Sequence, residues 1–407
     1  MNIIVQKYGG TSVGSIERIE NVAKRIIRQK KRGDSLVIVV SAMSGETNRL
    51  ISLAHEIAEC PDPLHYDMLF AAGEQVSIAL LAIALIKKGI EARAFLGYQV
   101  HIVTDRTYKK ARIKLIEKSK IIKELEAGSV VIVAGCQGVD EEGNITTLGR
   151  GGSDTTAIAL AAALNAMDCE IYTDVDGVYT SDPRIVLTAR KIDKLTFDEM
   201  LEMASLGAKV LQIRSCELAK KYCVPLRVRS SFNNTKGTYI GEEVKKMEER
   251  VISAVCIDKD QARFTLLGLP FKPNIMKEIF GPLSERSIVI DMIVQNPPMG
   301  NKINLSFTVS KSDYHETKKI LKKLKSRYSD SAITDEQKIA KISVVGVGMV
   351  SQSGVAHTMF DILGKHNIPI KMISTSEIKI SCIVDLAQAD AAANALHTGF
   401  GLDNKRT

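Results

Sequence analysis

Five short apolar stretches, separated by longer segments, constrain the fold most strongly. They are rich in β-branched residues and apolar on both faces, as are strands buried on both sides of a parallel sheet. The stretches are residues 2–6, 35–42, 92–97, 129–135 and 169–175. Helical patterns lie between them, for example QVSIALLAIALIKKG (75–89) and TTAIALAAALNA (155–166). This alternation predicts a doubly wound α/β domain, in which ligands bind at the carboxyl ends of the strands.

The last third of the chain contains an internal repeat with a spacing of 80 residues. The matching pairs are Gly268 and Gly348, Phe280 and Phe360, Leu283 and Leu363, Ile288 and Ile368, Ile290 and Ile370, Met292 and Met372, and Ile293 and Ile373. Each copy has the pattern of a small βαββαβ module. We therefore expect four parts: a first domain (1–245), a linker with a strand that packs on the modules (246–263), a first module (264–337) and a second module (338–407).

The composition limits the class of protein. The net charge of +8 is modest for 407 residues, and the basic clusters at 24–32 and 318–327 interleave Ile or Leu at helical spacing. They are typical of the solvated faces of amphipathic helices, so no nucleic-acid partner is expected. The seven cysteines include no CxxC pair, which favours reduced thiols in a cytoplasmic protein. No apolar run approaches the roughly 20 residues that span a bilayer, so no membrane partner is expected.

The stretch KYGGTSVG (7–14) follows the first predicted strand. In a Walker A loop the lysine comes after the glycines, whereas Lys7 precedes them here. Gly9 and Gly10 allow backbone N–H groups to approach an anion closely, and Lys7 can place a point charge on the same phosphate. Taken alone, a purely structural turn would explain this stretch equally well.

Two further polar segments also follow predicted strands. In LGRGGSDTTAIAL (148–160), Arg150 and two glycines precede a helix whose first turn contains Asp154. A helix start with small residues is an anion site, although Asp154 could simply cap the helix. In TDVDGVYTSDPR (173–184), three aspartates resemble the start of a calcium loop, but the closing glutamate is absent. A loop over a nucleotide, with Tyr179 as one wall, fits this segment better.

Taken together, these segments resemble the aspartate kinases of the amino acid kinase family over essentially the whole chain. The motifs that carry the resemblance are KYGGTSVG (7–14), VVSAMSGETN (39–48), Gly73-Glu74, GRGGSDTTA (149–157), TDVDGVYTSDPR (173–184), GAKVLQIRS (207–215), KGT (236–238) and ISTSEIKIS (373–381). The resemblance implies a three-layer α/β kinase domain with a mostly parallel sheet. Two ferredoxin-like βαββαβ modules of the ACT type would follow it.

The implied reaction moves the γ-phosphoryl group of ATP to the side-chain carboxylate of L-aspartate. The product, 4-phospho-L-aspartate, begins the biosynthesis of lysine (through diaminopimelate), threonine and methionine. The nucleophile has a free pKa of about 3.9, so it is already ionised at pH 7 and needs no general base. The site must instead hold two anions in line, with cations and backbone donors at the phosphates. Mg²⁺ would be held chiefly by ATP and water, so no protein metal ligands are expected.

By resemblance, Lys7 and Asp154 are the catalytic pair, with Asp154 organising the lysine rather than removing a proton. Arg150 would hold the carboxylate of aspartate, and Glu74, expected at a helix start, would meet its ammonium group. The implied ATP-binding residues are Lys7, Tyr8, Gly9, Gly10, Thr173, Asp174, Tyr179, Asp182, Arg184, Lys209 and Val210. The implied aspartate-binding residues are Ser41, Thr47, Glu74, Arg150, Gly151, Gly152 and Ser153. Outside this context, Glu74 would be interpreted as a first-turn helix carboxylate and Lys209 as a surface lysine.

Paired ACT modules imply feedback inhibition by an amino acid, lysine or threonine or both. The implied effector-binding residues are Asn274, Asp291, Gln295, Val355, Ala356, Ile370 and Ser376, with Asp291 as the partner of an ammonium group. Many relatives have Asp-Lys-Pro-Gly where this chain has Phe271-Lys272-Pro273-Asn274, and His-Pro-Gly-Val-Thr where it has residues 352–356 as Gln-Ser-Gly-Val-Ala. Pro369 stands where an Asn is common. We therefore expect inhibition to be weak or tuned to another effector.

Assembly and alternative functions complete the predictions. The resemblance implies a homo-oligomer through the ACT modules, and Met247 could start a shorter regulatory subunit, although a plain internal methionine is the simpler interpretation. Acetylglutamate, glutamate 5- and uridylate kinases share the fold but usually lack the paired modules. A non-catalytic amino-acid sensor would have lost Lys7, Asp154 or the nucleotide loop, and this sequence retains all three.

Overall fold

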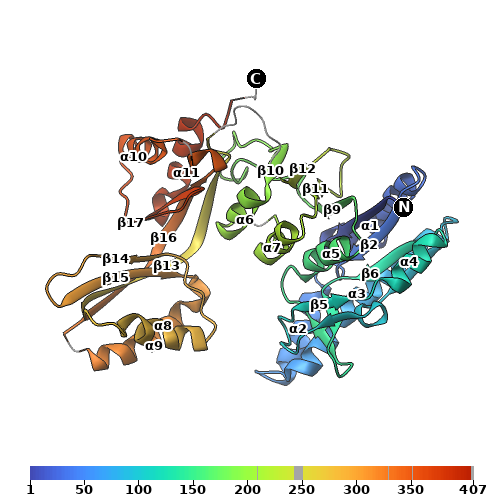
Figure 1. Cartoon of the computed structure of the whole chain (residues 1–407), viewed down its shortest axis with the longest axis horizontal. Coiled ribbons are helices and arrows are strands. Elements are labelled where there is room, and N and C mark those ends of the chain that lie inside the picture. The colour runs from blue at the N-terminus through green and yellow to red at the C-terminus, as the bar shows by residue number, and fades with distance from the viewer. Residues whose placement is uncertain (209, 243–250, 329, 351, 405–407) are drawn as a thin grey trace. The chain divides into compact units, whose positions relative to one another are not determined.

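The structure is a computed structural model that describes residues 1–208, 210–242, 251–328, 330–350 and 352–404. The chain forms two compact units (Figure 1). The first unit comprises Met1–Val178, Lys191–Ala204 and Lys209–Lys245, and the second comprises Tyr179–Arg190, Ser205–Ala208 and Lys246–Thr407. Each unit is described by itself below.

The first unit is built on an eight-stranded sheet with the order β10-β12-β11-β9-β1-β2-β6-β3. Its strands are β1 (Ile3–Tyr8), β2 (Ser35–Val40), β3 (Ala92–Phe95), β6 (Val130–Ala134), β9 (Asp168–Thr173), β10 (Lys194–Thr196), β11 (Leu226–Ser230) and β12 (Thr238–Gly241). Five of them coincide with the five apolar stretches. All neighbouring pairs are parallel except β11 with β12. The predicted α/β class with a mostly parallel sheet is confirmed.

Helices cover both faces of this sheet. The helices of the unit are α1 (Ile16–Lys30), α2 (Glu46–Ile57), α3 (Pro63–Ile86), α4 (Ser119–Glu126), α5 (Gly152–Ala163), α6 (Phe197–Ser205) and α7 (Ile213–Lys221). The apolar stripes of α1 and α3 pack on one face, in one core with alternate residues of β1, β2 and β6. Helix α5 lies against β1, β2 and β9, and α7 packs on α5. The first basic cluster lies on the exposed side of α1, as its pattern predicts.

The alternation of side chains along β1 decides which residues face which helix layer. Tyr8 lies in the core with α1 and α3, and Gln6 points to the same side because residues two apart share a face. Lys7 points to the opposite face, toward α5. One strand therefore contributes to the core on one side and places a cation on the other.

A second, four-stranded sheet in this unit is absent from the predictions. Its order is β5-β4-β7-β8, with β4 (Ile102–Thr104), β5 (Ile113–Ile116), β7 (Gln137–Val139) and β8 (Ile145–Thr147). Each strand has only three or four residues, and several of their side chains are exposed or half-buried. Such short segments carry little of the apolar signal that identifies a strand in sequence.

Helix α3 is long and apolar enough to cross a membrane by length and composition, contrary to the expectation from apolar runs. Half of its most apolar window is buried inside the unit, where α3 contacts α1, α2, β3, β6 and β8. Two carboxylates on the helix, Asp67 and Glu74, are buried as well. Helix α3 therefore packs as a core helix of the first unit.

The second unit contains a six-stranded antiparallel sheet with the order β14-β15-β13-β16-β18-β17. Its strands are β13 (Ala254–Pro270), β14 (Ile293–Gln295), β15 (Lys302–Val309), β16 (Ala332–Val345), β17 (Met372–Thr375) and β18 (Lys379–Asp385). Its helices are α8 (Ile275–Glu285), α9 (Tyr314–Arg327), α10 (Val355–Lys365) and α11 (Ala389–Gly399). Helices α8 and α10 begin 80 residues apart, in agreement with the repeat.

The two long strands β13 and β16 are shared between the two modules. The later part of β13 forms the first module with α8, β14, β15, α9 and the start of β16. The end of β16 opens the second module, whose fourth strand is supplied by residues 254–258 at the start of β13. The second module therefore begins before the first in the sequence, and the two share one continuous sheet.

Candidate active site

The polar turns after three parallel strands, β1, β2 and β9, meet at one edge of the large sheet. Along β1, Tyr8 pairs with Val40 of β2 and with Tyr172 of β9. Backbone hydrogen bonds continue this alignment past the strand ends: Gly9 N–H donates to Tyr172 O and Ser41 N–H donates to Tyr8 O. Parallel strands present their carboxyl ends at one edge, where α/β proteins bind ligands. The structure thus brings the first glycine turn beside Ser41 and Thr173.

Lys7 and Asp154 form an ion pair at this edge. Lys7 Nζ lies 2.6 Å from Asp154 Oδ1, and the two side chains are 12% and 10% exposed. Asp154 is in the first turn of α5, which packs on β1, so the carboxylate reaches the face of the strand toward which Lys7 points. A close ion pair between two nearly buried side chains restricts the position of both groups. The ammonium group of Lys7 is therefore held at the end of β1, beside the glycine turn.

The glycine turn of KYGG lies tightly against the segment after β2. A Cβ atom on Gly10 would come within 2.8 Å of Ala42 O, so this position requires glycine. Tyr8 contributes only its main chain to this side. Its ring is fully buried on the other face, stacks on Tyr172 with ring centroids 4.7 Å apart, and donates a hydrogen bond to Gln6. The backbone of this turn and the Lys7 ammonium are the groups available to an anion.

The start of α5 presents Arg150 beside this turn region. Gly151 has a φ of 72°, in the left-handed region that glycine adopts at little cost, and this turns the chain into the helix. Arg150 is exposed, and its guanidinium has no hydrogen bond or ion pair with any of the described residues. Ser153 packs against Gly135, which follows β6. The segment therefore offers an available guanidinium directly before the helix, while Gly151 and Gly152 lie close to Gln212 and Cys136.

Glu74 lies in the middle of α3, so the expectation that it stands at a helix start is wrong. Asp62 caps the helix through the backbone N–H of His65, and Pro63 occupies its first turn, which starts α3 well before Glu74. Gly73 lets the helix approach the chain after β2, because a Cβ there would meet Ala42 Cβ at 2.8 Å. Glu74 consequently lies next to the backbone of the VVSAMSGETN segment.

The carboxylate of Glu74 is 3% exposed and only partly satisfied. Its Oε1 accepts a hydrogen bond of 3.2 Å from the backbone N–H of Ala42, whereas Oε2 has no hydrogen-bond partner among the residues that the structure describes. Burial raises the pKa of Glu74 to about 7, against a smaller lowering by the Ala42 N–H. A buried carboxylate with an unused oxygen is suited to receive a cation. Ser41 and Thr47, both half-buried, lie before and after Ala42 in the same segment.

Sequence reasoning missed two residues that support the loop of Arg150. Asp67 of α3 is fully buried, and it accepts hydrogen bonds from the N–H and hydroxyl of Thr147 and from the N–H of Lys109. Arg214 lies within the GAKVLQIRS motif, and its guanidinium donates to Leu148 O at 3.0 Å. Both contacts fix the backbone just before Arg150. A lone aspartate in an apolar helix was the available signal for Asp67.

The residues assigned to the nucleotide are divided between the two units. Thr173 and Asp174 lie at the end of β9 in the first unit, where Thr173 Oγ1 donates to Asp174 Oδ1 at 3.0 Å. Tyr179, Asp182 and Arg184 belong to the second unit. Val210 is half-buried in a turn of the first unit, and Lys209 lies outside the described residues.

Asp182 and Arg184 pair with each other. Arg184 Nε donates to Asp182 Oδ1 at 3.0 Å and Nη2 donates to Oδ2 at 2.8 Å, so the contact is bidentate. The side-chain hydrogen bond from Arg184 lowers the pKa of Asp182. The two residues therefore form a charged pair on either side of Pro183.

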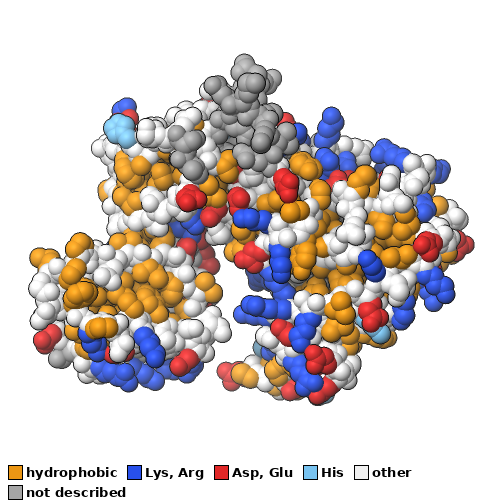
Figure 2. All heavy atoms as spheres, in the orientation of Figure 1, with side chains coloured by type: hydrophobic (Ala, Val, Ile, Leu, Met, Phe, Trp, Pro, Cys, Tyr) orange, Lys and Arg blue, Asp and Glu red, His pale blue; other side chains and the backbone are white. Residues whose placement is uncertain are grey.

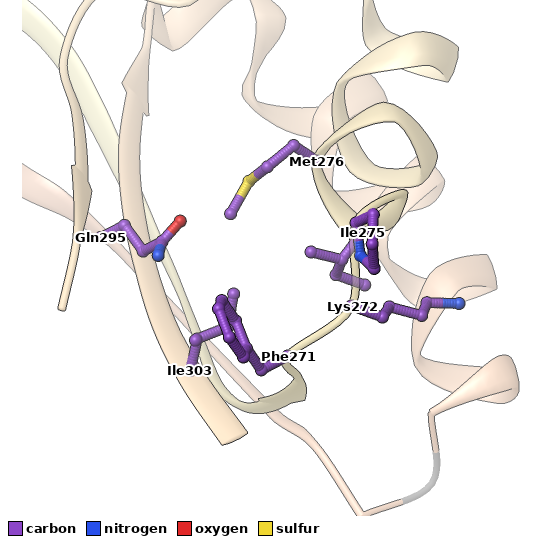
Figure 3. Close-up of a pocket in the computed structure, with 7 residues that line it drawn as sticks. Phe271, Lys272, Ile275, Met276, Gln295 and Ile303 are labelled. Carbon is purple, nitrogen blue, oxygen red and sulfur yellow. The ribbon is translucent and has the colours of Figure 1, made fainter. Parts of the chain in front are cut away.

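A cavity of about 280 Å³ lies in the first module, between the β13–α8 turn and the β14–β15 strands. It is lined by Phe271, Lys272, Pro273, Ile275, Met276, Gln295 and Ile303. Figure 3 shows the amide of Gln295 and the thioether of Met276 directed toward the space, and the Lys272 amine directed away from it. The Lys272 Nζ donates to Glu278 at 2.7 Å. Among the residues assigned to an effector, Gln295 lines this cavity and Asn274 immediately precedes α8 at its rim.

Asp291, assigned to the ammonium group of an effector, is already paired within the second unit. Its carboxylate accepts a hydrogen bond from the Nζ of Lys341, which is only 2% exposed. The remaining assigned residues belong to the second module: Val355 and Ala356 begin α10, Ile370 precedes β17, and Ser376 follows it. The N–H of Ser376 donates to Lys379 O.

No group of three or more His, Cys, Asp or Glu side chains that could hold a metal occurs in the described part of the chain. The seven cysteines are free thiols, and five of them are buried.

Comparison with known proteins places these features in a family. The model of the amino acid kinase family matches residues 2–230, and an ACT domain model matches residues 342–400. An aspartate kinase from Stutzerimonas stutzeri is 53% identical over 404 residues, which covers 99% of this chain and 98% of that protein.

Two solved structures match nearly the whole fold. One is E. coli aspartokinase III in complex with aspartate and ADP, in the R-state, with a TM-score of 0.82 and 26% identity over 98% of this chain and 99% of that one. The other is the same enzyme in complex with lysine and aspartate, in the T-state, with a TM-score of 0.79, 26% identity and the same coverage.

Proposed function

The chain belongs to the aspartate kinases of the amino acid kinase family, and from this premise we propose that it forms 4-phospho-L-aspartate from ATP and L-aspartate in the cytoplasm, as the first step toward lysine, threonine and methionine. The observation that carries the proposal is the Lys7–Asp154 pair at the carboxyl edge of the sheet, beside the glycine turn. An assay that traps the acyl phosphate as a hydroxamate tests it. Absence of ATP-dependent hydroxamate with aspartate would refute the proposal.

The residues of the site act mainly by position and charge. The attacking carboxylate of aspartate is ionised at neutral pH, so the reaction needs the two anions held in line rather than a general base. The Lys7 ammonium, held by Asp154, stabilises the negative charge that develops on the transferred group, and the backbone N–H group of Gly10 adds a fixed dipole, whereas the N–H of Gly9 already donates to Tyr172 O. Asp154 has its carboxylate on Lys7, so it positions the lysine.

Arg150 and Glu74 are proposed to bind the α-carboxylate and the α-ammonium group of the substrate aspartate, respectively. The exposed guanidinium of Arg150 suits a carboxylate because its planar fork can donate two parallel hydrogen bonds. The buried carboxylate of Glu74, with one oxygen lacking a partner among described groups, suits the ammonium group. Both residues lie in the first unit with Lys7.

Arg150→Ala should raise the KM for aspartate about tenfold and change kcat little. A charge-assisted hydrogen bond contributes about 1.5 to 3 kcal/mol, and the exposure of Arg150 places it at the lower end. Steady-state kinetics with aspartate varied at saturating ATP measure the effect. Arg93→Ala, which removes an exposed arginine from β3, is the control. An unchanged KM for aspartate would remove Arg150 from the substrate site.

Mg²⁺ is the proposed cofactor, carried with ATP. Mg²⁺ usually keeps several waters and binds substrate phosphates, and we expect it to be held in this way here. When bound, the ion would neutralise part of the charge on the phosphates.

The residues proposed to bind the nucleotide, besides those of the glycine turn, are Thr173, Asp174, Tyr179, Asp182, Arg184, Lys209 and Val210.

We propose that an amino-acid effector, threonine or lysine, regulates the enzyme through the first-module cavity. The lining is apolar apart from Gln295 and Lys272, and no carboxylate lines it. Asp291 does not line it either and already pairs with Lys341. A lysine side chain would lose its hydration there without a counter-charge, which is unfavourable. The cavity therefore favours an amino acid with an uncharged side chain, such as threonine, over lysine.

Phe271→Asp should shift the preference toward lysine by about tenfold, because it places a carboxylate at the cavity where an ion pair with the ammonium group can form. The ratio of the inhibition constants for threonine and lysine measures the shift. Ser326→Asp, which adds the same charge on the exposed side of α9, is the control. The assignment of this cavity to threonine would be contradicted if lysine inhibited the unmodified enzyme more strongly than threonine and if Phe271→Asp left the ratio of the two inhibition constants unchanged.

We propose that a second copy of the chain covers the β14 edge of the first module. Figure 2 shows hydrophobic side chains gathered over β14 and β15. Ile293 on the edge strand β14 is 52% exposed, and Val289 just before it is 74% exposed. An edge strand with exposed apolar side chains is a typical surface for pairing between copies.

Two further predictions from the sequence are kept as proposals. One is a shorter regulatory subunit that starts at Met247, a residue that lies outside the described residues. The other is the set of domain boundaries, 1–245, 246–263, 264–337 and 338–407.

A further inference from the structure

The segment Tyr179–Arg190 belongs to the second unit, although the chain on both sides of it belongs to the first. It contains Tyr179, Asp182 and Arg184, three of the residues proposed to surround the nucleotide. The ends of the segment are tied together: Thr180 N–H donates to Arg190 O at 2.8 Å, and Arg190 N–H donates to Thr180 Oγ1 at 2.9 Å. The segment is therefore a closed loop whose neck is at Thr180 and Arg190.

The loop is packed into the core of the second ACT module. Val186 is fully buried in a cluster with Val255 and Leu396. The backbone N–H of Val255, on the strand that completes the second module, donates to Thr180 O at 2.8 Å. Asn394 of α11 donates through Nδ2 to Ile185 O at 3.2 Å. The buried side chain of Val186 and the two hydrogen bonds to carbonyl groups of the loop give the loop a defined position in this unit.

His397, in the last turn of α11, links the two sides of this loop. Its side chain has no solvent exposure. Nε2 lies 2.8 Å from Thr180 Oγ1 and Nδ1 lies 3.4 Å from Thr188 Oγ1. His397 is therefore in contact with the hydroxyl of Thr180 at the neck of the loop and with that of Thr188, two residues before the other side of the neck.

The hydrogen bonds are compatible with a neutral histidine that is protonated on Nδ1. Thr180 Oγ1 already accepts the N–H of Arg190, so its own proton is available for His397 Nε2. Nε2 is then an acceptor, and Nδ1–H is the donor toward Thr188. Burial lowers the pKa of His397, in keeping with this neutral form; of the charged groups that act on it, Asp403 opposes the lowering and Arg190 adds to it.

We propose that His397 is a positioning residue for the nucleotide. By holding Thr180 and Thr188, it sets the backbone between them and hence the placement of Tyr179, Asp182 and Arg184. A change at His397 should therefore act on the KM for ATP rather than on that for aspartate. This inference rests on the proposed function, because the nucleotide role of the three residues comes from it.

The test compares His397→Asn with His397→Gln in the full-length enzyme. The asparagine amide can replace Nδ1 but does not reach Thr180, whereas the glutamine amide reaches the position of Nε2 and can accept the Thr180 hydroxyl. We expect His397→Asn to raise the KM for ATP about fivefold to tenfold, with the KM for aspartate within twofold, and His397→Gln to restore most of the loss. His366→Asn, at the exposed end of α10, is the control and should leave both constants unchanged.

Thr188→Val provides a second variant that removes an exposed hydroxyl and leaves the buried histidine in place. We expect a twofold to threefold rise in the KM for ATP alone. An unchanged KM for ATP in folded His397→Asn, or equal rises in both KM values, would overturn the proposal while leaving the aspartate kinase reaction intact. If instead the unmodified enzyme forms no hydroxamate, the proposed function fails. Melting curves of each variant establish that the protein is folded.

Discussion

Lys7→Met is expected to lower kcat for aspartate phosphorylation about 100-fold to 1000-fold, while the protein remains folded. Removing one preorganised donor from developing charge in a transition state costs about 2.7 to 4 kcal/mol. Lys7 fits that case because Asp154 fixes its ammonium at the end of β1, next to the glycine turn. The hydroxamate assay at saturating ATP and aspartate measures kcat. Lys24→Met, which removes an exposed lysine from α1, is the matched control.

The double variant Lys7→Met, Asp154→Asn separates catalysis from stability. Lys7→Met alone leaves the Asp154 carboxylate nearly buried without its partner, which is destabilising by about 3 to 5 kcal/mol. Asp154→Asn removes that charge, so the double variant should melt at a higher temperature than the single one. Its kcat should nevertheless stay low, because the ammonium is still absent. A kcat for either variant within tenfold of the unmodified enzyme would exclude Lys7 from the transition state.

The core of the site could be predicted because it depends on local patterns and on one general rule of sheet topology. The strands that carry Lys7, Ser41 and Thr173 are short apolar runs followed by glycine or polar turns, and parallel strands align such turns at one edge. The meeting of Lys7 with Asp154 follows once α5 packs on β1. The resemblance to a family then supplied their chemical roles, which the pattern alone left open.

The parts that could not be predicted depend on packing between distant segments. The position of Glu74 within α3 is set by a cap at Asp62, twelve residues away, which the apolar pattern from residue 75 onward obscures. A strand within residues 246–263 that packs on the modules was predicted, but the pairing of residues 254–258 with the end of β16, which completes the second module, was not, because no local pattern encodes that pairing. The inclusion of Tyr179–Arg190 in the second unit likewise rests on the burial of Val186 among residues more than 60 positions later in the chain.

Glu74→Gln is expected to raise the KM for aspartate about 10-fold to 100-fold, because it removes the charge that would pair with the substrate ammonium in a buried site. Hydrogen bonds to charged groups contribute about 1.5 to 3 kcal/mol. The glutamine amide would keep an oxygen for the N–H of Ala42, so the local structure should persist. The control is Glu56→Gln, an exposed glutamate on α2. A KM for aspartate within twofold of the unmodified enzyme would remove Glu74 from the substrate site.

The same substitution makes an opposite prediction for the substrate-free protein, where the Glu74 charge is unfavourable. The pKa of Glu74 is raised from 4.5 to about 7, so the folded state binds its proton more tightly than the unfolded state does. Stability is therefore lost as pH rises from 4.5 to 7, by up to about 3 kcal/mol above pH 7. Glu74→Gln should remove this loss, so that the variant gains in melting temperature relative to the unmodified protein at pH 8 but not at pH 4.5.

Substrate binding links these two effects, because the ammonium group of aspartate requires the ionised form of Glu74. Aspartate should therefore bind the unmodified enzyme more tightly as pH rises through 7 and release a proton from Glu74 at lower pH. Calorimetric titrations at pH 6.5 in two buffers with different ionisation enthalpies measure that proton, and Glu74→Gln should abolish its release. Binding of aspartate with no proton release by the unmodified enzyme would mean that Glu74 does not meet the ammonium group, whatever its effect on KM.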